Sequence, residues 1–220
     1  MSENALRLAV FDMDGVLTSN PSSWEFVHRS FGVDNSANFR LYRQGKLPYI
    51  EFLRSDVSLW IQKNGPISAD HVIGILDQIP LRRGISETVT LLSERGIRSA
   101  IVSGGIYWLA EKIARTTEFV SIYANKIKTD SSNFLIPDGE VMVEPGRKDI
   151  AIREIQRTLG IGARETISIG DTSQDVAMFR NSAISIAFNP ADGSLRQKVT
   201  AEIFGDDVSA IIEVIDQNSA

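Results

Sequence analysis

Two aspartates stand two positions apart, directly after an apolar segment. Asp12 and Asp14 follow the run of residues 6–11, which is short, apolar and stopped by acid and glycine. Such a run predicts a buried strand that delivers the next side chains to a loop at its carboxyl end, the edge where open α/β sheets bind ligands. Two like charges this close repel each other, and a cation or a shared proton offsets the repulsion. The pair therefore indicates a metal site.

Polar groups that suit an anion follow at two later places in the chain. Ser103 precedes Gly104 and Gly105 at the end of another apolar run, so a hydroxyl and backbone amides without side chains can approach a phosphate closely. Lys148 opens an expected helix, and anions are favoured near a helix amino terminus. These residues are candidates for phosphate binding.

A second acidic pair, Asp171 and Asp175, follows a further expected strand, with a spacing that a turn entering a helix brings to one side. A hard divalent cation such as Mg²⁺ prefers carboxylate oxygens, waters and substrate phosphate, so Asp12 and Asp171 are expected ligands. In phosphoryl transfer the metal, Lys148 and Ser103 would neutralise charge while a carboxylate attacks phosphorus. Together these residues predict a site for a metal-bound phosphate.

Each of these features also has a simpler explanation when it is taken alone. Two aspartates after a strand are usually solvated loop carboxylates or turn formers. Ser103 with two glycines fits a turn or a helix N-cap, Lys148 fits a solvent-facing side chain, and Asp175 fits a helix dipole. The combination of all four motifs favours catalysis over these alternatives.

The elements that hold these residues follow a pattern of strands alternating with helices, which is typical of a parallel, doubly wound α/β sheet. The expected strands cover residues 6–11, 98–102, 121–124, 166–169 and 183–188. Two expected helices, 85–95 and 148–159, end before Gly96 and Gly160, which suit a left-handed cap.

One segment breaks the alternation, because residues 21–79 show helical periodicity and no convincing buried strand. Proline and glycine punctuate its flanks, 17–21 and 80–84, so a helical insertion is expected. Its helices are expected at residues 22–31, 35–44, 48–62 and 68–79, the last capped by Ser68. Farther on, the segment IPDGE at 136–140 lies between β-prone flanks and indicates a hairpin.

The composition is that of an ordinary globular protein. The 220 residues are 43% hydrophobic and 23% charged, which excludes disordered and fibrous classes. A net charge of -5 without long basic runs argues against nucleic acid and anionic membranes as partners. The chain has no cysteine, which excludes disulfides and thiolate metal sites and suits the cytoplasm. No secretion or membrane signal is expected.

The four motifs occur in the order and at separations typical of phosphatases of the haloacid dehalogenase superfamily. The chain resembles the phosphoserine phosphatase branch over nearly its whole length, from its first acidic pair to Asp175. The resemblance implies a Rossmann-like, doubly wound parallel sheet core, residues 1–17 and 81–220, with an inserted helical cap of the C1 type, residues 18–80. The cap would select the substrate.

The resemblance also implies a role for each motif residue. Asp12 would form an aspartyl-phosphate, and Asp14 would act first as general acid and then as general base. Asp171 would bind Mg²⁺ together with Asp12 and the backbone carbonyl of Asp14, while Asp175 would support the water shell of the metal. Lys148, with Ser103 and its neighbouring glycines, would hold the phosphoryl group.

The expected substrate pocket departs from the phosphoserine pattern. The position of the arginine that grips the substrate carboxylate in that branch is held by Asp56, and that of its amine-binding glutamate by Pro21, with Glu25 the nearest carboxylate. Three arginines, Arg40, Arg43 and Arg54, could substitute by a different route. Tyr49 either packs in the insertion or lines the pocket, so Arg54, Asp56 and Tyr49 are the expected substrate contacts.

The predicted function is Mg²⁺-dependent hydrolysis of a small phosphomonoester through an aspartyl-phosphate, by a monomer or homodimer in the cytoplasm. Phosphoserine is expected to be a poor substrate, because Asp56 would repel its carboxylate. Two alternatives stay open: a phosphotransferase or mutase that uses the same intermediate, and a phosphometabolite-binding protein without turnover. Dehalogenation is disfavoured, since the resemblance associates dehalogenases with loss of the acid held here by Asp14.

Overall fold

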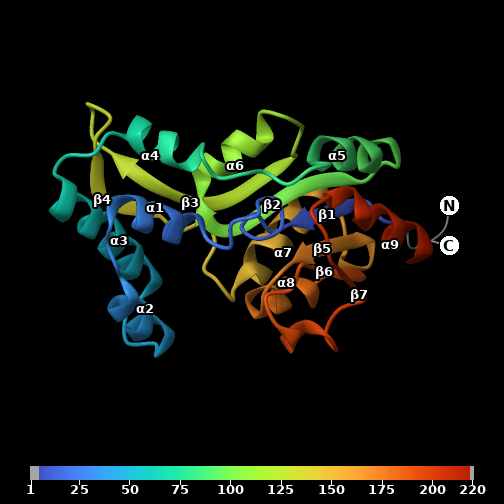
Figure 1. Cartoon of the computed structure of the whole chain (residues 1–220). Helices are drawn as coiled ribbons and strands as arrows, with labels where there is room; N and C mark the ends of the chain where they lie inside the picture. Colours follow the sequence, from blue (N-terminus) through green and yellow to red (C-terminus); the bar gives the residue numbers. More distant parts are fainter. Residues whose placement is uncertain (1–4, 219–220) are drawn as a thin grey trace.

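The computed structural model describes residues 5–218, and a seven-stranded sheet runs through its centre (Figure 1). The strand order is β4-β3-β2-β1-β5-β6-β7, and every neighbouring pair is parallel except β3 and β4. The strands are β1 (Leu8–Phe11), β2 (Arg98–Ile106), β3 (Ser121–Thr129), β4 (Leu135–Glu140), β5 (Thr166–Gly170), β6 (Ile184–Phe188) and β7 (Ala201–Ile203). This order confirms the doubly wound α/β fold.

Helices cover both faces of the sheet, because alternate side chains of its strands are buried on opposite sides. In β1, Leu8 and Val10 pack with α7 and α8, whereas Ala9 and Phe11 pack with α5, α6 and α9. These helices are α5 (Ile85–Glu94), α6 (Tyr107–Ala114), α7 (Lys148–Leu159), α8 (Val176–Phe179) and α9 (Ile211–Asn218). Figure 1 shows α5 and α6 above the sheet and α7 and α8 below it. The two layers bury β1 on both faces.

The expected helix ends are found in the structure. Gly160 has a φ of 62° and caps α7, and its amide donates to carbonyls of the last turn. Gly96 has a φ of 75° just after α5, so both glycines adopt the left-handed conformation that other residues avoid. None of the helices among residues 5–218 is long and apolar enough to cross a membrane.

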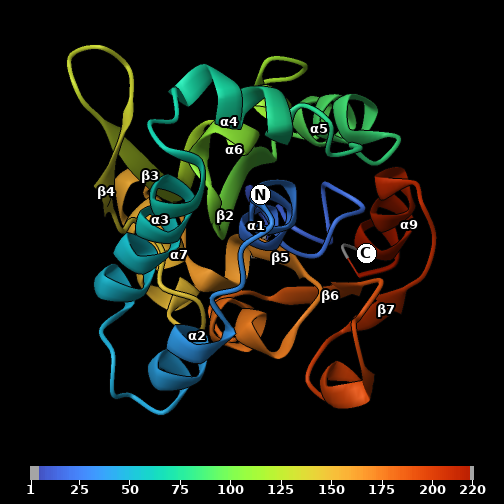
Figure 2. The ribbon, with the colours of Figure 1, turned by 60° about the vertical axis from the view of Figure 1, so that its left-hand side comes forward.

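Four helices lie between β1 and α5, in agreement with the helical insertion that the sequence predicted. They are α1 (Ser23–Phe31), α2 (Ser36–Arg43), α3 (Tyr49–Asn64) and α4 (Ala69–Leu76). Serine hydroxyls cap two of them, since Ser22 accepts from the amide of Glu25 and Ser68 from the amide of His71. Helix α3 packs against β4, and Figure 2 shows α2 and α3 on the side of the sheet where β3 and β4 lie.

The hairpin is present, but its turn lies elsewhere than the IPDGE segment suggested. Strands β3 and β4 pair antiparallel, with Ile127 opposite Gly139, and the segment lies inside β4. The turn is at residues 130–134, where the Asp130 carboxylate accepts from the amides of Ser132 and Phe134. Because β4 is an edge strand, it tolerates a proline better than a central strand would. The hydrogen bonds of Asp130 therefore mark the turn of the hairpin, whereas the proline and glycine of the IPDGE segment lie within the strand.

Candidate active site

Three strands deliver polar groups to one edge of the sheet. Asp12 follows β1 and Asp171 follows β5, and Phe11 lies beside Ile169 in the parallel register that joins these strands. Ser103 lies within β2, where the pairing with β3 is interrupted between Val102 and Ile106. The chain leaves β1 toward β2 on one side and reaches β5 on the other, so this edge is a topological switch point.

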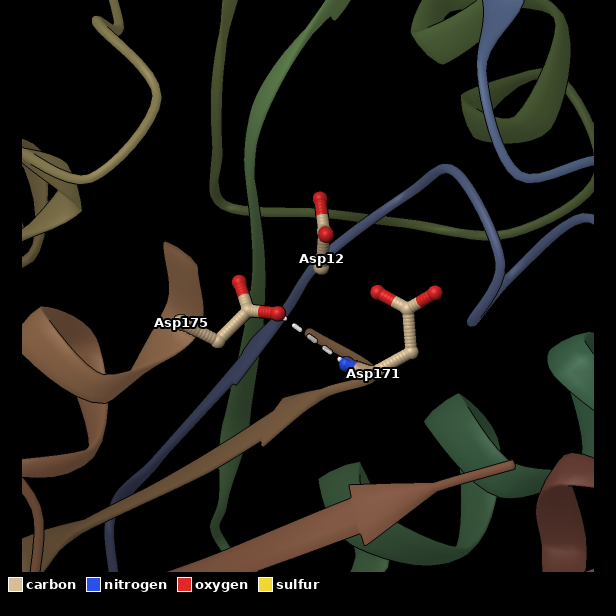
Figure 3. Close-up of side chains that lie close together, drawn as sticks. All are labelled: Asp12, Asp171 and Asp175. Carbon is tan, nitrogen blue, oxygen red and sulfur yellow. Dashed lines mark hydrogen bonds between the residues drawn. The ribbon is translucent and has the colours of Figure 1, made fainter. Parts of the chain in front are cut away.

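Asp12, Asp171 and Asp175 form a buried cluster (Figure 3), in which one ligand atom of each lies within 4.8 Å of the others. The Asp175 carboxylate accepts from the backbone amides of Asp171, at 3.0 Å, and Thr172, at 2.9 Å. Burial raises the pKa of Asp12 to about 7, although the attraction of Lys148 opposes the rise. Burial and the nearby carboxylates raise the pKa of Asp171 to about 9. The cluster thus carries the repulsion expected of a site for a cation.

Lys148 is the buried ammonium of this cluster. Its Nζ lies 2.7 Å from Asp12 Oδ2 and 2.6 Å from Asp175 Oδ1. Burial favours the neutral amine, but the charges of Asp12 and Asp175 outweigh it and raise the pKa of Lys148. When all three carboxylates are ionised, one ammonium leaves the cluster negative. Oxygen ligands with excess negative charge fit a hard divalent cation, so the donor set is suited to a metal.

Asp14 stands apart from that cluster and is held by the helical insertion. Its Oδ2 accepts from the amide of Ser23 at 3.0 Å and from the hydroxyl of Ser23 at 2.8 Å. Its Oδ1 is buried and has no hydrogen-bond partner among residues 5–218. Burial raises the pKa of Asp14 to about 6, while the two Ser23 hydrogen bonds oppose the rise. A carboxyl group with a free oxygen and a pKa near neutrality can exchange a proton with a bound molecule.

Gly105 allows Asp14 to approach β2. A Cβ atom at Gly105 would lie 2.5 Å from Asp14 Oδ2 and 2.7 Å from Ser23 Oγ, closer than side-chain contacts allow. The amide of Gly105 donates to the Ser103 hydroxyl at 3.1 Å, and Gly104 packs against Pro145. The serine and both glycines therefore line one wall beside the two amino-terminal aspartates.

A cavity of about 590 Å³ joins these groups to the helical insertion. It is lined by most of the predicted site residues: Asp12, Asp14, Tyr49, Ser103, Gly104, Gly105, Lys148 and Asp171. Asp175 lies behind the others, fully buried and hydrogen-bonded to them. The structure therefore brings the four motifs together around one space.

Two expected substrate contacts do not reach the cavity. Asp56 is only 2% exposed and lies behind its wall, where its Oδ1 is 3.0 Å from His28 Nε2 and accepts from Asn35 Nδ2 at 2.5 Å. Arg54 turns to the opposite side of α3 and pairs with Asp138 of β4, at 2.9 Å, and with Glu51. The placement of Asp56 and Arg54 in the pocket is therefore corrected: α3 turns Asp56 into the interior and Arg54 toward β4.

Several residues at the site were not predicted as site residues from the sequence. Ser23 orients Asp14, and Asn125 donates to the carbonyl of Gly104 and to the hydroxyl of Tyr49. His28 and Asn35 line the cavity, as do Trp24, Thr172 and Gln174. Ser23 directly follows Ser22, the N-cap of α1. That cap is the one local sequence signal near the contact between Ser23 and Asp14. Asn125 carried none, because it lies within a strand-forming run.

The sequence of the chain matches the model of the haloacid dehalogenase-like hydrolases over residues 9–180. The chain belongs to this family. It is 30% identical over 216 residues to the phosphoserine phosphatase of Methanocaldococcus jannaschii, covering 97% of this chain and 99% of that protein. It is 27% identical to the phosphoserine phosphatase of Campylobacter jejuni, covering 96% and 100%.

Solved structures give the same result for this hydrolase. A substrate-bound phosphoserine phosphatase complex superposes with a TM-score of 0.78 at 26% identity, covering 96% of this chain and 99% of that one. A phospho-aspartyl intermediate analogue of phosphoserine phosphatase superposes with a TM-score of 0.77 at 26% identity and the same coverage. The family resemblance inferred from the four motifs is confirmed, and so is the fold that it implied.

Proposed function

We propose that this hydrolase cleaves phosphomonoesters of small metabolites with Mg²⁺, through an aspartyl-phosphate formed on Asp12. The observation that carries the proposal is the 2.7 Å contact between Asp12 and Lys148 inside a three-carboxylate cluster that opens on a cavity. The relatives named phosphoserine phosphatases, and the phospho-aspartyl analogue of one of them, support it.

The side chains divide the reaction into two displacements. An Asp12 oxygen attacks phosphorus, the bond from phosphorus to the ester oxygen breaks, and Asp14 gives its proton to the departing oxygen. Asp14 then takes a proton from water, whose oxygen attacks phosphorus and releases Asp12 and inorganic phosphate. Lys148 and Ser103, with the amides of the following glycines, offset the charge of the phosphoryl oxygens. Bound Mg²⁺, held by Asp12, Asp171 and the Asp14 carbonyl, would neutralise further charge.

The pKa of Asp14 near 6 suits both of its proposed tasks. A group that titrates close to neutral pH is a competent acid when protonated and a competent base when ionised. The Ser23 contacts leave Oδ1 as the free oxygen for this exchange. Asp175 then acts as a positioning residue, because its oxygens accept from Lys148 and from the amide of Asp171.

The helical insertion, residues 18–80, is proposed as a cap over the core formed by residues 1–17 and 81–220. Its residues line the same cavity as the catalytic groups, and Ser23 at the start of α1 fixes Asp14. A segment that both encloses the leaving group and positions the proton carrier can select substrates and exclude water.

Inorganic phosphate release from p-nitrophenyl phosphate and a panel of metabolite esters, with Mg²⁺, tests the proposal. Turnover that Asp12→Asn abolishes is the expected result, whereas no release from any ester contradicts it and favours a binding protein. Adding alcohols as acceptors separates hydrolysis from phosphotransfer, because a transferase forms new phosphate esters at the expense of free phosphate. Water is the acceptor in the proposed reaction, so alcohols should leave phosphate release unchanged.

A cytoplasmic location and a monomeric or homodimeric state stay predictions from the sequence. The partner proposed for the site is a small phosphorylated metabolite rather than nucleic acid, since the net charge is -5. Gel filtration with light scattering measures the state of assembly directly, and a trimer or larger ring would contradict that prediction.

A further inference from the structure

The part of the cavity formed by the helical insertion is lined with aromatic rings. Trp24 comes from α1, Phe39 and Tyr42 from α2, and Tyr49 and Phe52 from α3. The rings of Tyr42 and Phe52 are stacked at a centroid distance of 5.6 Å, and those of Tyr42 and Tyr49 are 5.2 Å apart. These five residues are called the aromatic wall below.

The polar tips of the aromatic wall are already used within the protein. Trp24 Nε1 donates to the carbonyl of Gly104 at 3.0 Å, and the Tyr49 hydroxyl donates to the same carbonyl at 3.3 Å. The Tyr42 hydroxyl donates to the carbonyl of Pro145 at 3.3 Å. Gly104 follows Ser103 in β2, so Trp24 and Tyr49 stand directly beside the phosphate-binding groups. A leaving group beside these three rings meets their faces, because their N–H and O–H groups already donate within the protein.

Two polar side chains between the rings are equally occupied. Trp60 Nε1 donates to His28 Nδ1 at 2.7 Å, so Nδ1 is an acceptor and the proton of the neutral ring is assigned to Nε2, which faces Asp56. Asn35 donates from Nδ2 to Asp56 and to Ser55 Oγ, and its Oδ1 accepts from Asn38. Neither His28 nor Asn35 keeps a free group of its own for a substrate carboxylate.

The charges of this part of the cavity are mainly negative. Glu25 and Asp34 line it, and Asp56 lies just behind His28. Arg29 is the single cation among the described residues of the insertion that line the cavity. Its side chain is 57% exposed, and it donates to Asn20 Oδ1 at 3.2 Å and Glu25 Oε1 at 3.4 Å. These charges favour a positively charged group of the substrate and provide little electrostatic attraction for a carboxylate.

We propose that the substrate is the phosphate ester of an amino alcohol, with an ammonium group and no carboxylate. The proposal rests on the phosphatase function proposed above and adds the class of leaving group. Ring faces attract ammonium groups, and the attraction grows when the site is shielded from water. Phosphocholine and phosphoethanolamine represent this class, while phosphoserine adds a carboxylate that the insertion would have to desolvate without an unpaired cation.

Two matched pairs of esters test the proposal with the whole protein and Mg²⁺. Phosphocholine and 3,3-dimethylbutyl phosphate have the same shape but differ in charge, and phosphoethanolamine and phosphoserine differ in the carboxylate. In each pair the first is expected to have a kcat/KM at least about tenfold higher. Equal values in the first pair would show a merely apolar pocket, and phosphoserine ahead in the second would show carboxylate recognition; either overturns the proposal.

Failure of the phosphatase function is distinguishable from failure of this inference. If no ester is hydrolysed, the proposed function fails, and calorimetric binding of phosphocholine and 3,3-dimethylbutyl phosphate then decides the inference. Tighter binding of phosphocholine supports ammonium recognition, and equal binding overturns it.

Variants locate the effect in the aromatic wall. Tyr42→Leu and Phe52→Leu keep apolar bulk but remove a ring, so the preference for phosphocholine over its neutral isostere should fall at least about threefold. Phe204→Leu is the matched control, because Phe204 is 69% exposed and does not line the cavity. A ratio of two substrates on one preparation does not depend on the fraction folded. Unchanged ratios in both wall variants, or phosphoserine turnover that Arg29→Ala destroys, would contradict the proposal.

Discussion

The hydroxyl of Ser23, at the start of α1, donates to Asp14 Oδ2 at 2.8 Å and also accepts the amide of Ile106 at 3.1 Å. One side chain of the helical insertion therefore joins the loop after β1 to the end of β2. The insertion therefore orients the proposed proton carrier, Asp14, affects its acidity and also lines the cavity.

Ser23→Ala should raise the pKa of Asp14 further, because the Ser23 hydrogen bonds oppose the rise caused by burial. The limb of the pH–rate profile that reports Asp14 should move up by about one unit, since a hydrogen bond to a charged group is worth about 1.5 kcal/mol and one pKa unit corresponds to about 1.36 kcal/mol. Steady-state kinetics from about pH 5 to about pH 9 measure it. Ser30→Ala, on the exposed side of the same helix, is the control. If this limb of the profile does not move, the Ser23 hydroxyl does not affect the pKa of Asp14.

Asp12→Asn should lower turnover by at least about 10⁴-fold while the chain stays folded. The amide has nearly the same volume but lacks the charge needed for attack, and Lys148 keeps its contact with Asp175. Phosphate release and circular dichroism measure the two effects. Asp70→Asn changes an exposed carboxylate on α4 outside the cavity and should leave the rate unchanged. Substantial activity in the Asp12 variant would remove it as the nucleophile.

Chelation should stop catalysis, Mg²⁺ should restore it, and Ca²⁺ should not. The cluster offers few oxygens in a compact arrangement, which suits an octahedral Mg²⁺ that keeps several waters. Ca²⁺ prefers roughly six to eight ligands in looser geometry, so phosphate and Asp12 would be poorly aligned. Activity of chelated protein with each added metal is the measurement. Full rates in excess chelator would exclude the metal from the reaction.

Without metal, the folded chain should lose stability as the pH rises. The ordinary pKa of an aspartate is 3.8, whereas burial raises the pKa of Asp14 to about 6 and, with the repulsion of Asp12 and Asp175, that of Asp171 to about 9. Raised values mean that the folded state binds these protons more tightly than the unfolded state. The stabilisation is therefore full below about pH 4 and is lost as the pH rises through the folded values.

Asp171→Asn checks this directly. In chelator at about pH 8 the variant should melt at least about 2 °C above the unmodified protein, a shift that about 1 kcal/mol produces in a chain of this size. At about pH 3 the difference should nearly vanish, because this pH lies below the ordinary aspartate pKa of 3.8 and Asp171 is then mostly protonated in both states. Mg²⁺ should raise the melting temperature of the unmodified protein more than that of the variant. A variant less stable at about pH 8 would contradict the like-charge account.

Local patterns carried most of the fold. Strand runs that end in acid or glycine, helices that end at Gly96 and Gly160, and Ser68 at the start of α4 all depend on neighbouring residues, so the chain alone reveals them. The sequence also predicted that the four motifs meet, because parallel strands bring their carboxyl ends to one edge of the sheet. The hairpin turn was misplaced because a turn signal inside an edge strand is tolerated there.

The tertiary structure alone decided which side chains meet the substrate cavity. In α3 the residues Leu53, Asp56, Val57 and Trp60 share one buried face, so the rotation of that helix places Asp56 in the interior. Tyr49 and Phe52 reach the cavity from the same helix. Sequence by itself determined the family and the candidate catalytic residues, because these residues lie at strand ends with a distinctive pattern. It did not determine the substrate contacts, because these depend on how far each helix of the insertion is turned about its axis when it packs against the sheet.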